Sequence, residues 1–143
     1  MITMDDIAGA WRLVAWEIDV PGMDEPMYPF SDKPVGWLVY SPDGVMSAQL
    51  MRPDRPGLGG RSIRKLDEEE RLAVLETFFA YAGHYHIDGD TIVHQVDVAL
   101  NPDFIGQDQF RKATLNGEML TLTGQETDVK GRQRGHRLIW ERI

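Results

Sequence analysis

Hydrophobic and polar residues alternate in several short stretches of the chain, which is the pattern of β-strands that bury one face. In the first stretch, residues 9–20, Trp11 and Leu13 share one face with Glu17. We therefore predict a strand here, with Trp11 and Leu13 turned inward and Glu17 beside them. Prolines and glycines then interrupt regular pairing over residues 21–34, which predicts a long loop.

The next two strands, predicted over 35–41 and 45–52, surround the turn sequence Pro42-Asp43-Gly44. Proline presets the backbone angle that this turn needs, and glycine accepts a positive φ. A three-residue loop fixes which side chains lie opposite each other, and we place one set of pairs on the inner face. This inner set consists of Tyr40 opposite Met46 and Leu38 opposite Ala48.

A helix is predicted to begin after Asp67, which can cap it together with Glu70, three residues further on. Apolar residues at helical spacing continue the pattern to about Ala82, and Gly83 can end the helix. We expect the apolar stripe to pack against the rest of the protein. The stripe consists of Leu72, Leu75, Phe78, Phe79 and Ala82.

Two further hairpins are predicted around Asp88-Gly89 and Asn116-Gly117, dipeptides that favour two-residue turns. Their strands are expected over 84–87, 91–100, 107–115 and 118–124, and a last strand over 136–142. The sequence thus predicts an all-β fold, a single antiparallel up-and-down β-barrel of about eight strands, with one helix between the third and fourth strands. Such a barrel leaves no exposed strand edge and can hold one small ligand. We expect one domain over residues 1–143.

Charge and composition exclude several classes of function. The net charge of −8 opposes binding to nucleic acids and anionic membranes, and no apolar run approaches the ~20 residues of a membrane span. The absence of cysteine excludes disulfides, thiolate catalysis and cysteine-ligated metals. The start of the chain has no basic region followed by an apolar stretch, so we expect a cytoplasmic protein. The basic segment 52–65 is either a solvated loop or a rim that guides anions. Whether 21–34 and 52–66 act as lids stays open.

His94 falls on an otherwise apolar inner face, which it shares with Ile92 and Val96. A two-residue turn at Asp88-Gly89 pairs Ile92 with Tyr85, which places the phenol one step from His94. A buried imidazole needs a hydrogen-bond partner or loses its charge, and Tyr85 is our candidate partner.

Arg111 and Gln109 are also expected to point inward. A turn at Asn116-Gly117 pairs Arg111 with Leu122, so both polar residues share the face of the leucines. An interior arginine needs a carboxylate, a tyrosine, water or an anionic ligand group, and Glu17 is a candidate counter-ion. These polar residues either satisfy one another or contact a ligand.

Two histidines, His84 and His86, have the i, i+2 spacing that puts both rings on one strand face. The two-residue turn places them on the outside. A three-residue turn at Ile87-Asp88-Gly89 would instead align them with His94 as a metal or haem ligand set. Because Asp-Gly favours the shorter turn, we predict no metal and no cofactor.

The spacing of many of these residues resembles the bacterial and fungal lipocalin-like domain family over nearly the whole chain. The residues that carry the resemblance are Gly9-x-Trp11, Tyr28-Pro29-Phe30, Gly36, Tyr40, Pro42-Asp43-Gly44, Met46-Ser47-Ala48, Tyr81-Ala82-Gly83-x-Tyr85, His94, Pro102, Gly106, Gln109, Arg111 and Trp140-Glu141-Arg142. The resemblance implies a calycin-type barrel around a cavity for a small, largely apolar molecule. It also implies that Trp11 plugs the barrel floor with Arg142 stacked on it.

We predict that the barrel binds a small hydrophobic molecule with a polar end. The expected ligand contacts are Tyr40, Met46, Tyr85, His94, Gln109, Arg111 and Trp140. The alternative is a cofactor-independent isomerase or cyclase of small-molecule biosynthesis, in which His94 removes a proton while Arg111 and Tyr85 stabilise the enolate. A third interpretation is a protein-association module, and the sequence is also compatible with a homodimer.

Overall fold

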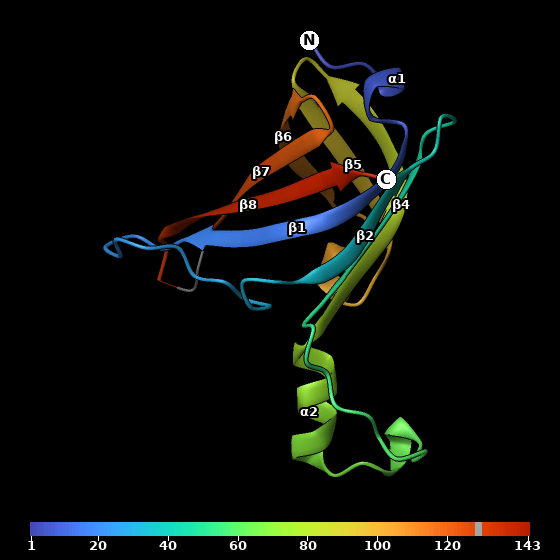
Figure 1. Cartoon of the computed structure of the whole chain (residues 1–143), viewed down its shortest axis with the longest axis vertical. Coiled ribbons are helices and arrows are strands. Elements are labelled where there is room, and N and C mark those ends of the chain that lie inside the picture. The colour runs from blue at the N-terminus through green and yellow to red at the C-terminus, as the bar shows by residue number, and fades with distance from the viewer. Residues whose placement is uncertain (128–129) are drawn as a thin grey trace.

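Eight antiparallel strands form a closed barrel in the computed structural model, which describes residues 1–127 and 130–143 (Figure 1). Each strand pairs with the next along the chain, and the last strand pairs with the first. The strands are β1 (Gly9–Asp19), β2 (Val35–Tyr40), β3 (Val45–Met51), β4 (Phe78–Asp88), β5 (Thr91–Ala99), β6 (Asp108–Asn116), β7 (Met119–Thr127) and β8 (Gln133–Arg142). The predicted all-β barrel, with a helix between the third and fourth strands, is confirmed.

The helical elements are short and lie outside the barrel wall. They are α1 (Met4–Ile7), α2 (Glu68–Glu76) and two 3₁₀ turns, η1 (Ile63–Lys65) and η2 (Pro102–Phe104). Within the part of the chain that the structure describes, no helix has the length and apolar character needed to cross a membrane.

One end of the barrel is closed by Trp11, whose side chain is fully buried. Its indole N–H donates to the carbonyl of Ile7 in α1 over 2.9 Å. The guanidinium carbon of Arg142 lies 4.2 Å from the centre of the Trp11 ring, a cation–π contact. The stacking of Arg142 on Trp11 that the family resemblance implied is therefore confirmed.

A β-bulge at Val14 changes which residues of β1 face inward. Leu13 pairs with Trp140 of β8, but the next pair joins Ala15 to Ile139, so β1 has one extra residue. The inner face therefore passes from Leu13 to Trp16. The prediction that Glu17 lies on the inner face was wrong, because simple alternation does not anticipate the extra residue.

The first predicted hairpin has the expected register. Tyr40 pairs with Met46 and Leu38 pairs with Ala48, and all four side chains are buried. The inner faces of β2 and β3 were thus correctly predicted from the Pro-Asp-Gly turn.

The other two hairpins turn one residue later than predicted. The closing pairs are Asp88 with Thr91 and Asn116 with Met119, so the loops are Gly89-Asp90 and Gly117-Glu118. Both glycines have positive φ, while neither Asp90 nor Glu118 does, which is the arrangement of a turn with glycine at its first central position. Each register therefore shifts by two residues. A shift of two leaves every side chain on its predicted face.

The helix α2 is shorter than predicted and contributes no residue to the hydrophobic core. Its capping box between Asp67 and Glu70 is present as expected. However, the helix ends at Glu76, none of its residues is buried, and the predicted stripe does not pack on the barrel: Leu72 and Leu75 are about half exposed. Figure 1 shows α2 projecting beyond the barrel.

The segment from Phe78 to Gly83 belongs to β4 rather than to the helix. Phe79 pairs with Leu50 of β3 and Tyr81 pairs with Ala48, so the aromatic rings at alternate positions face inward. Pairing with β3 and burial of these rings outweigh the helical spacing of the same residues, since tertiary contacts override weak local propensities.

Candidate functional site

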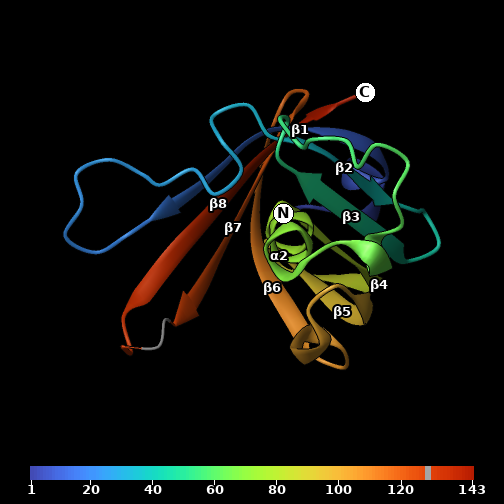
Figure 2. The same ribbon diagram turned by 90° about the horizontal axis from the view of Figure 1, so that it is seen from below.

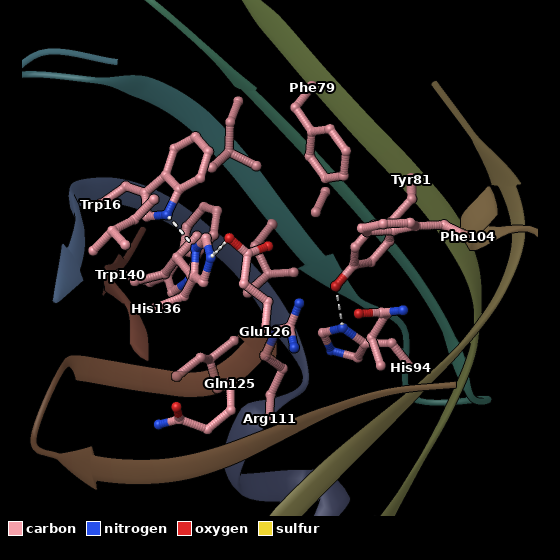
Figure 3. Close-up of a pocket in the computed structure, with 18 residues that line it drawn as sticks. Trp16, Phe79, Tyr81, His94, Phe104, Arg111, Gln125, Glu126, His136 and Trp140 are labelled. Atoms are coloured by element: carbon pink, nitrogen blue, oxygen red, sulfur yellow. Dashed lines mark hydrogen bonds and ion pairs between the residues drawn. The ribbon is translucent and has the colours of Figure 1, made fainter. Parts of the chain in front are cut away.

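The barrel encloses a cavity of about 450 Å³ in the half away from Trp11 (Figure 3). Its walls are mostly apolar, with polar groups on two sides. The lining residues are Trp16, Ile18, Leu38, Ala48, Leu50, Phe79, Tyr81, His94, Phe104, Gln109, Arg111, Leu122, Gly124, Gln125, Glu126, His136, Leu138 and Trp140. A cavity of this size and character is typical of sites for small organic molecules.

His94 is held between two tyrosines. Its Nε2 atom lies 2.7 Å from the hydroxyl of Tyr40 and its Nδ1 atom lies 2.7 Å from the hydroxyl of Tyr81. The side chain is almost completely buried. Burial, and next the positive charge of Arg111, lower the pKa of His94 to about 3, so the imidazole is neutral at physiological pH.

Tyr85 is not the partner of His94, contrary to our prediction. The two residues are directly opposite each other in the β4–β5 register, but the Tyr85 hydroxyl donates to the carbonyl of Ser41 over 2.5 Å. The register is responsible: Tyr85 pairs with His94 itself, and the side chain that reaches the imidazole from β4 is Tyr81, four residues earlier.

Arg111 lies where two strands of the barrel separate. β6 and β7 are paired only between the turn and the pair Lys112–Thr123. Beyond this pair, β7 and β8 diverge from β5 and β6 (Figure 2). Arg111 and Gly124 are the first residues past the last pair, and both line the cavity.

The Arg111 guanidinium has few partners within the protein. It donates to the carbonyl of Phe110 over 3.0 Å. Its positive charge acts on Tyr81 and opposes the rise that burial causes in the pKa of the Tyr81 hydroxyl. In residues 1–127 and 130–143, no ion pair joins Arg111 to a carboxylate. Glu17, our candidate counter-ion, instead lies 2.8 Å from Arg137 of β8.

A second polar group lies on the opposite wall, where β1 meets β8. The indole N–H of Trp16 donates to Nδ1 of His136 over 3.1 Å, and Nε2 of His136 lies 3.0 Å from a carboxylate oxygen of Glu126. The ring of Phe30, from the long loop after β1, packs edge-on against Trp16, with 4.9 Å between the ring centres. This part of the loop therefore supports the cavity wall.

The structure brings together some of the predicted ligand contacts. His94, Gln109, Arg111 and Trp140 line the cavity, whereas Tyr40, Met46 and Tyr85 are not among its lining residues. Met46 is buried in the hydrophobic core, and the Tyr40 hydroxyl contacts His94, which lines the cavity. Ligand contact by the predicted residues stays a prediction.

Sequence reasoning missed Tyr81, Trp16 and His136 as cavity residues. Tyr81 was assigned to the end of a helix, and Trp16 to the outside of β1. The alternation of Tyr81, Gly83 and Tyr85 was the signal for a strand with inward rings.

The alternative metal site is not formed. His84 and His86 are exposed and face away from the cavity, on the opposite side of β4 from Tyr85, while His94 is buried inside. His84 lies 3.0 Å from Asp97 of β5. Across the described residues, no cluster of His, Asp and Glu side chains could hold a metal ion.

The basic segment after β3 is largely engaged with nearby groups. Arg52 pairs with Asp54 at 3.0 Å, and Arg61 pairs with Glu70 of α2 at 2.7 Å. Arg55 donates to the carbonyl of Val74 over 3.2 Å. These contacts tie the segment to α2 and reduce the charge that it could offer to an anion.

A closed barrel with a largely apolar cavity and a few inward polar groups defines the class of barrels that hold small molecules. The sequence model of the lipocalin-like domain family matches residues 8–143, and the chain belongs to this family. It is also similar to the 4′-hydroxy-3′-methoxypropiophenone carrier protein ppsC of Aspergillus oryzae, with 27% identity over 107 residues, which cover 68% of this chain and 96% of the relative. Fold and relative together support ligand binding in general.

Proposed function

We propose that the protein binds and carries a small hydrophobic molecule with one polar end, held in the barrel cavity. The observation that carries this proposal is the mixed lining of the cavity: apolar side chains form most of the wall, and Tyr81, His94 and Arg111 form one of its two polar groups (Figure 3). Burial of the apolar body supplies affinity, and the polar cluster orients the polar end. The relative is named as the carrier of an aromatic ketone that also bears a hydroxyl and a methoxy group.

A carrier fits the state of His94 better than an enzyme that uses this residue as a base. Both ring nitrogens are already hydrogen-bonded to tyrosines, and the pKa is about 3. A general base needs a free nitrogen within reach of the substrate and a pKa near the working pH. His94 meets neither condition.

The test is to titrate the protein with 4′-hydroxy-3′-methoxypropiophenone and a panel of related aryl ketones by calorimetry. We expect one site per chain. Ala48→Phe, which fills the cavity, should weaken binding at least about tenfold, because the ligand loses buried contact area. Ala80→Phe is the matched control, because it adds the same ring on the outer face of the adjacent strand β4.

Binding that persists unchanged in Ala48→Phe would place the ligand outside the cavity and overturn the proposal. Mass spectrometry of the recovered ligand separates the two functional classes. A carrier returns the ligand unaltered, whereas a product formed by the wild-type protein and lost in Ala48→Phe would identify an enzyme.

A further inference from the structure

The direction of the hydrogen bonds around His94 indicates which chemical group the cavity binds. A neutral imidazole has one N–H donor and one acceptor nitrogen. Since both nitrogens contact a tyrosine hydroxyl, one tyrosine must donate to His94 and the other must accept from it. Which tyrosine does which decides where the remaining hydroxyl proton points.

Tyr40 is the tyrosine that donates. Its side chain is fully buried, and within the described residues His94 is the only hydrogen-bond partner of its hydroxyl. If Nε2 of His94 carried the proton, the Tyr40 proton would be buried without an acceptor, which is costly. Tyr40 therefore donates to Nε2, and the proton of His94 sits on Nδ1.

Tyr81 consequently accepts from Nδ1 of His94 and keeps its own proton for another partner. The Arg111 guanidinium, whose charge acts on the Tyr81 hydroxyl, can only donate and so cannot take this proton. Gln109 lies opposite His94 in the β5–β6 register, and its side chain makes no hydrogen bond in the described part of the chain. The Tyr81 hydroxyl proton thus turns toward the cavity, which Tyr81 lines.

The protonation state of Tyr81 agrees with this role. Burial raises its pKa above the usual value, so the hydroxyl keeps its proton at physiological pH. The Tyr81 hydroxyl thus offers the cavity a donor, and its complement is a ligand oxygen that accepts.

We propose that the Tyr81 hydroxyl and the Arg111 guanidinium together bind the carbonyl oxygen of a ketone ligand, with His94 and Tyr40 as positioning residues that direct the Tyr81 proton into the cavity. This inference rests on the proposed function and adds to it the chemical group that is recognised. Two donors aimed at one oxygen favour a carbonyl over the corresponding methylene, because the methylene would leave both donors unpaired in an apolar site.

The experiment compares propiophenone with propylbenzene, two ligands of nearly the same shape that differ in the carbonyl oxygen. The wild-type protein should bind propiophenone at least about tenfold more tightly. Tyr81→Phe should remove most of this preference, so that the two ligands bind with similar affinities. Tyr85→Phe is the matched control, because it removes the same atom from a neighbouring inward tyrosine whose hydroxyl is bound to Ser41.

The positioning role of Tyr40 and His94 has its own readout. In the wild-type protein, ¹⁵N NMR of His94 should show a protonated Nδ1 and an unprotonated Nε2. In Tyr40→Phe the acceptor at Nε2 loses its donor, so the two tautomers should mix and the ketone preference should fall. A change in packing alone would not move the ¹⁵N shifts between tautomers.

The outcomes separate this inference from the proposed function. Equal affinity for the two ligands in the wild-type protein, or a preference that survives Tyr81→Phe, would overturn the inference while cavity binding stands. A protonated Nε2 in the wild-type protein would overturn the direction of the hydrogen bonds. Failure of both ligands, and of the aryl ketone panel, to bind would instead overturn the proposed function.

Discussion

Arginine serves opposite purposes in the two halves of the barrel. At the closed end, Arg142 stacks on Trp11, donates to the carbonyls of Ala8 and Asp6, and lies 3.8 Å from a carboxylate oxygen of Glu118. In the open half, Arg111 donates to one backbone carbonyl and forms no ion pair with a carboxylate among the described residues.

The difference shows how a cavity is recognised in a small barrel. The guanidinium of Arg142 contacts an aromatic ring, two carbonyls and a carboxylate and is not among the residues that line the cavity, so its contacts stabilise the fold. A guanidinium that lines a cavity with donors to spare costs stability and is retained where it contacts a bound group. The closed half should therefore control stability, and the polar wall should control affinity.

The largest expected effect is a pH dependence of the unfolding free energy that arises from His94 in the polar wall. His94 has a pKa of about 3 in the folded protein, against about 6.5 when unfolded, so the unfolded chain binds the extra proton first as pH falls. The contribution of neutral His94 is present above pH 6.5 and is lost as pH falls toward 3. Between pH 7.5 and 4.5 the wild-type protein should lose about 2–3 kcal/mol relative to His94→Gln, measured by urea denaturation.

The titratable and charged groups that face His94 are Tyr40, Tyr81 and Arg111, from three different strands, and none of them changes charge in this pH range. His84→Gln is the control, since this exposed histidine should show no comparable difference. A constant gap between wild type and His94→Gln across the range would contradict a neutral buried His94.

The next prediction tests directly whether the two arginines have different roles. Arg142→Met removes the cation–π contact and two hydrogen bonds to carbonyls, and should cost about 2 kcal/mol of unfolding free energy with little change in ligand affinity. Arg111→Met should change stability by less than about 0.5 kcal/mol and weaken ketone binding about tenfold or more. Chemical denaturation and calorimetry on both variants measure the two quantities, and equal losses of stability would remove the distinction.

The smallest effect tests the position of Arg111. A Cβ added at Gly124 would lie 2.6 Å from Nη1 of Arg111 and 3.3 Å from the carbonyl of Phe110. Because the guanidinium is the end of a flexible side chain, Gly124→Ala should displace it, lowering ketone affinity about two- to fivefold and stability by less than about 1 kcal/mol. Gly57→Ala, where an added Cβ meets nothing, is the control, and identical affinities for both variants would show that Arg111 does not need its present position.

Much of the barrel could be predicted because turns, helix caps and strand faces depend on residues that are close together in the sequence. Turn sequences located the hairpins, and Asp67 with Glu70 located the start of α2. The inward faces of His94 and Arg111 were also correct although both registers were shifted, since a shift of two residues leaves the face unchanged.

The candidate site was harder to predict because it depends on contacts between distant strands. Tyr81 carries a helical pattern locally, and only pairing with β3 makes it a strand residue that reaches His94. Tyr40 was correctly placed inside, but its bond to His94 joins β2 to β5 across the barrel interior. The spacing of residues within one strand cannot predict a contact between two distant strands.

The bulge at Val14 separates two parts of β1 that have different roles. Before it, Trp11 and Leu13 fill the floor; after it, Trp16 and Ile18 form the wall of the cavity. The position of one extra residue thus fixes where the floor ends and the chamber begins. Moving that residue along β1 would deepen or shorten the chamber without a change in any other strand. The position of the bulge therefore determines how long a ligand the cavity can hold.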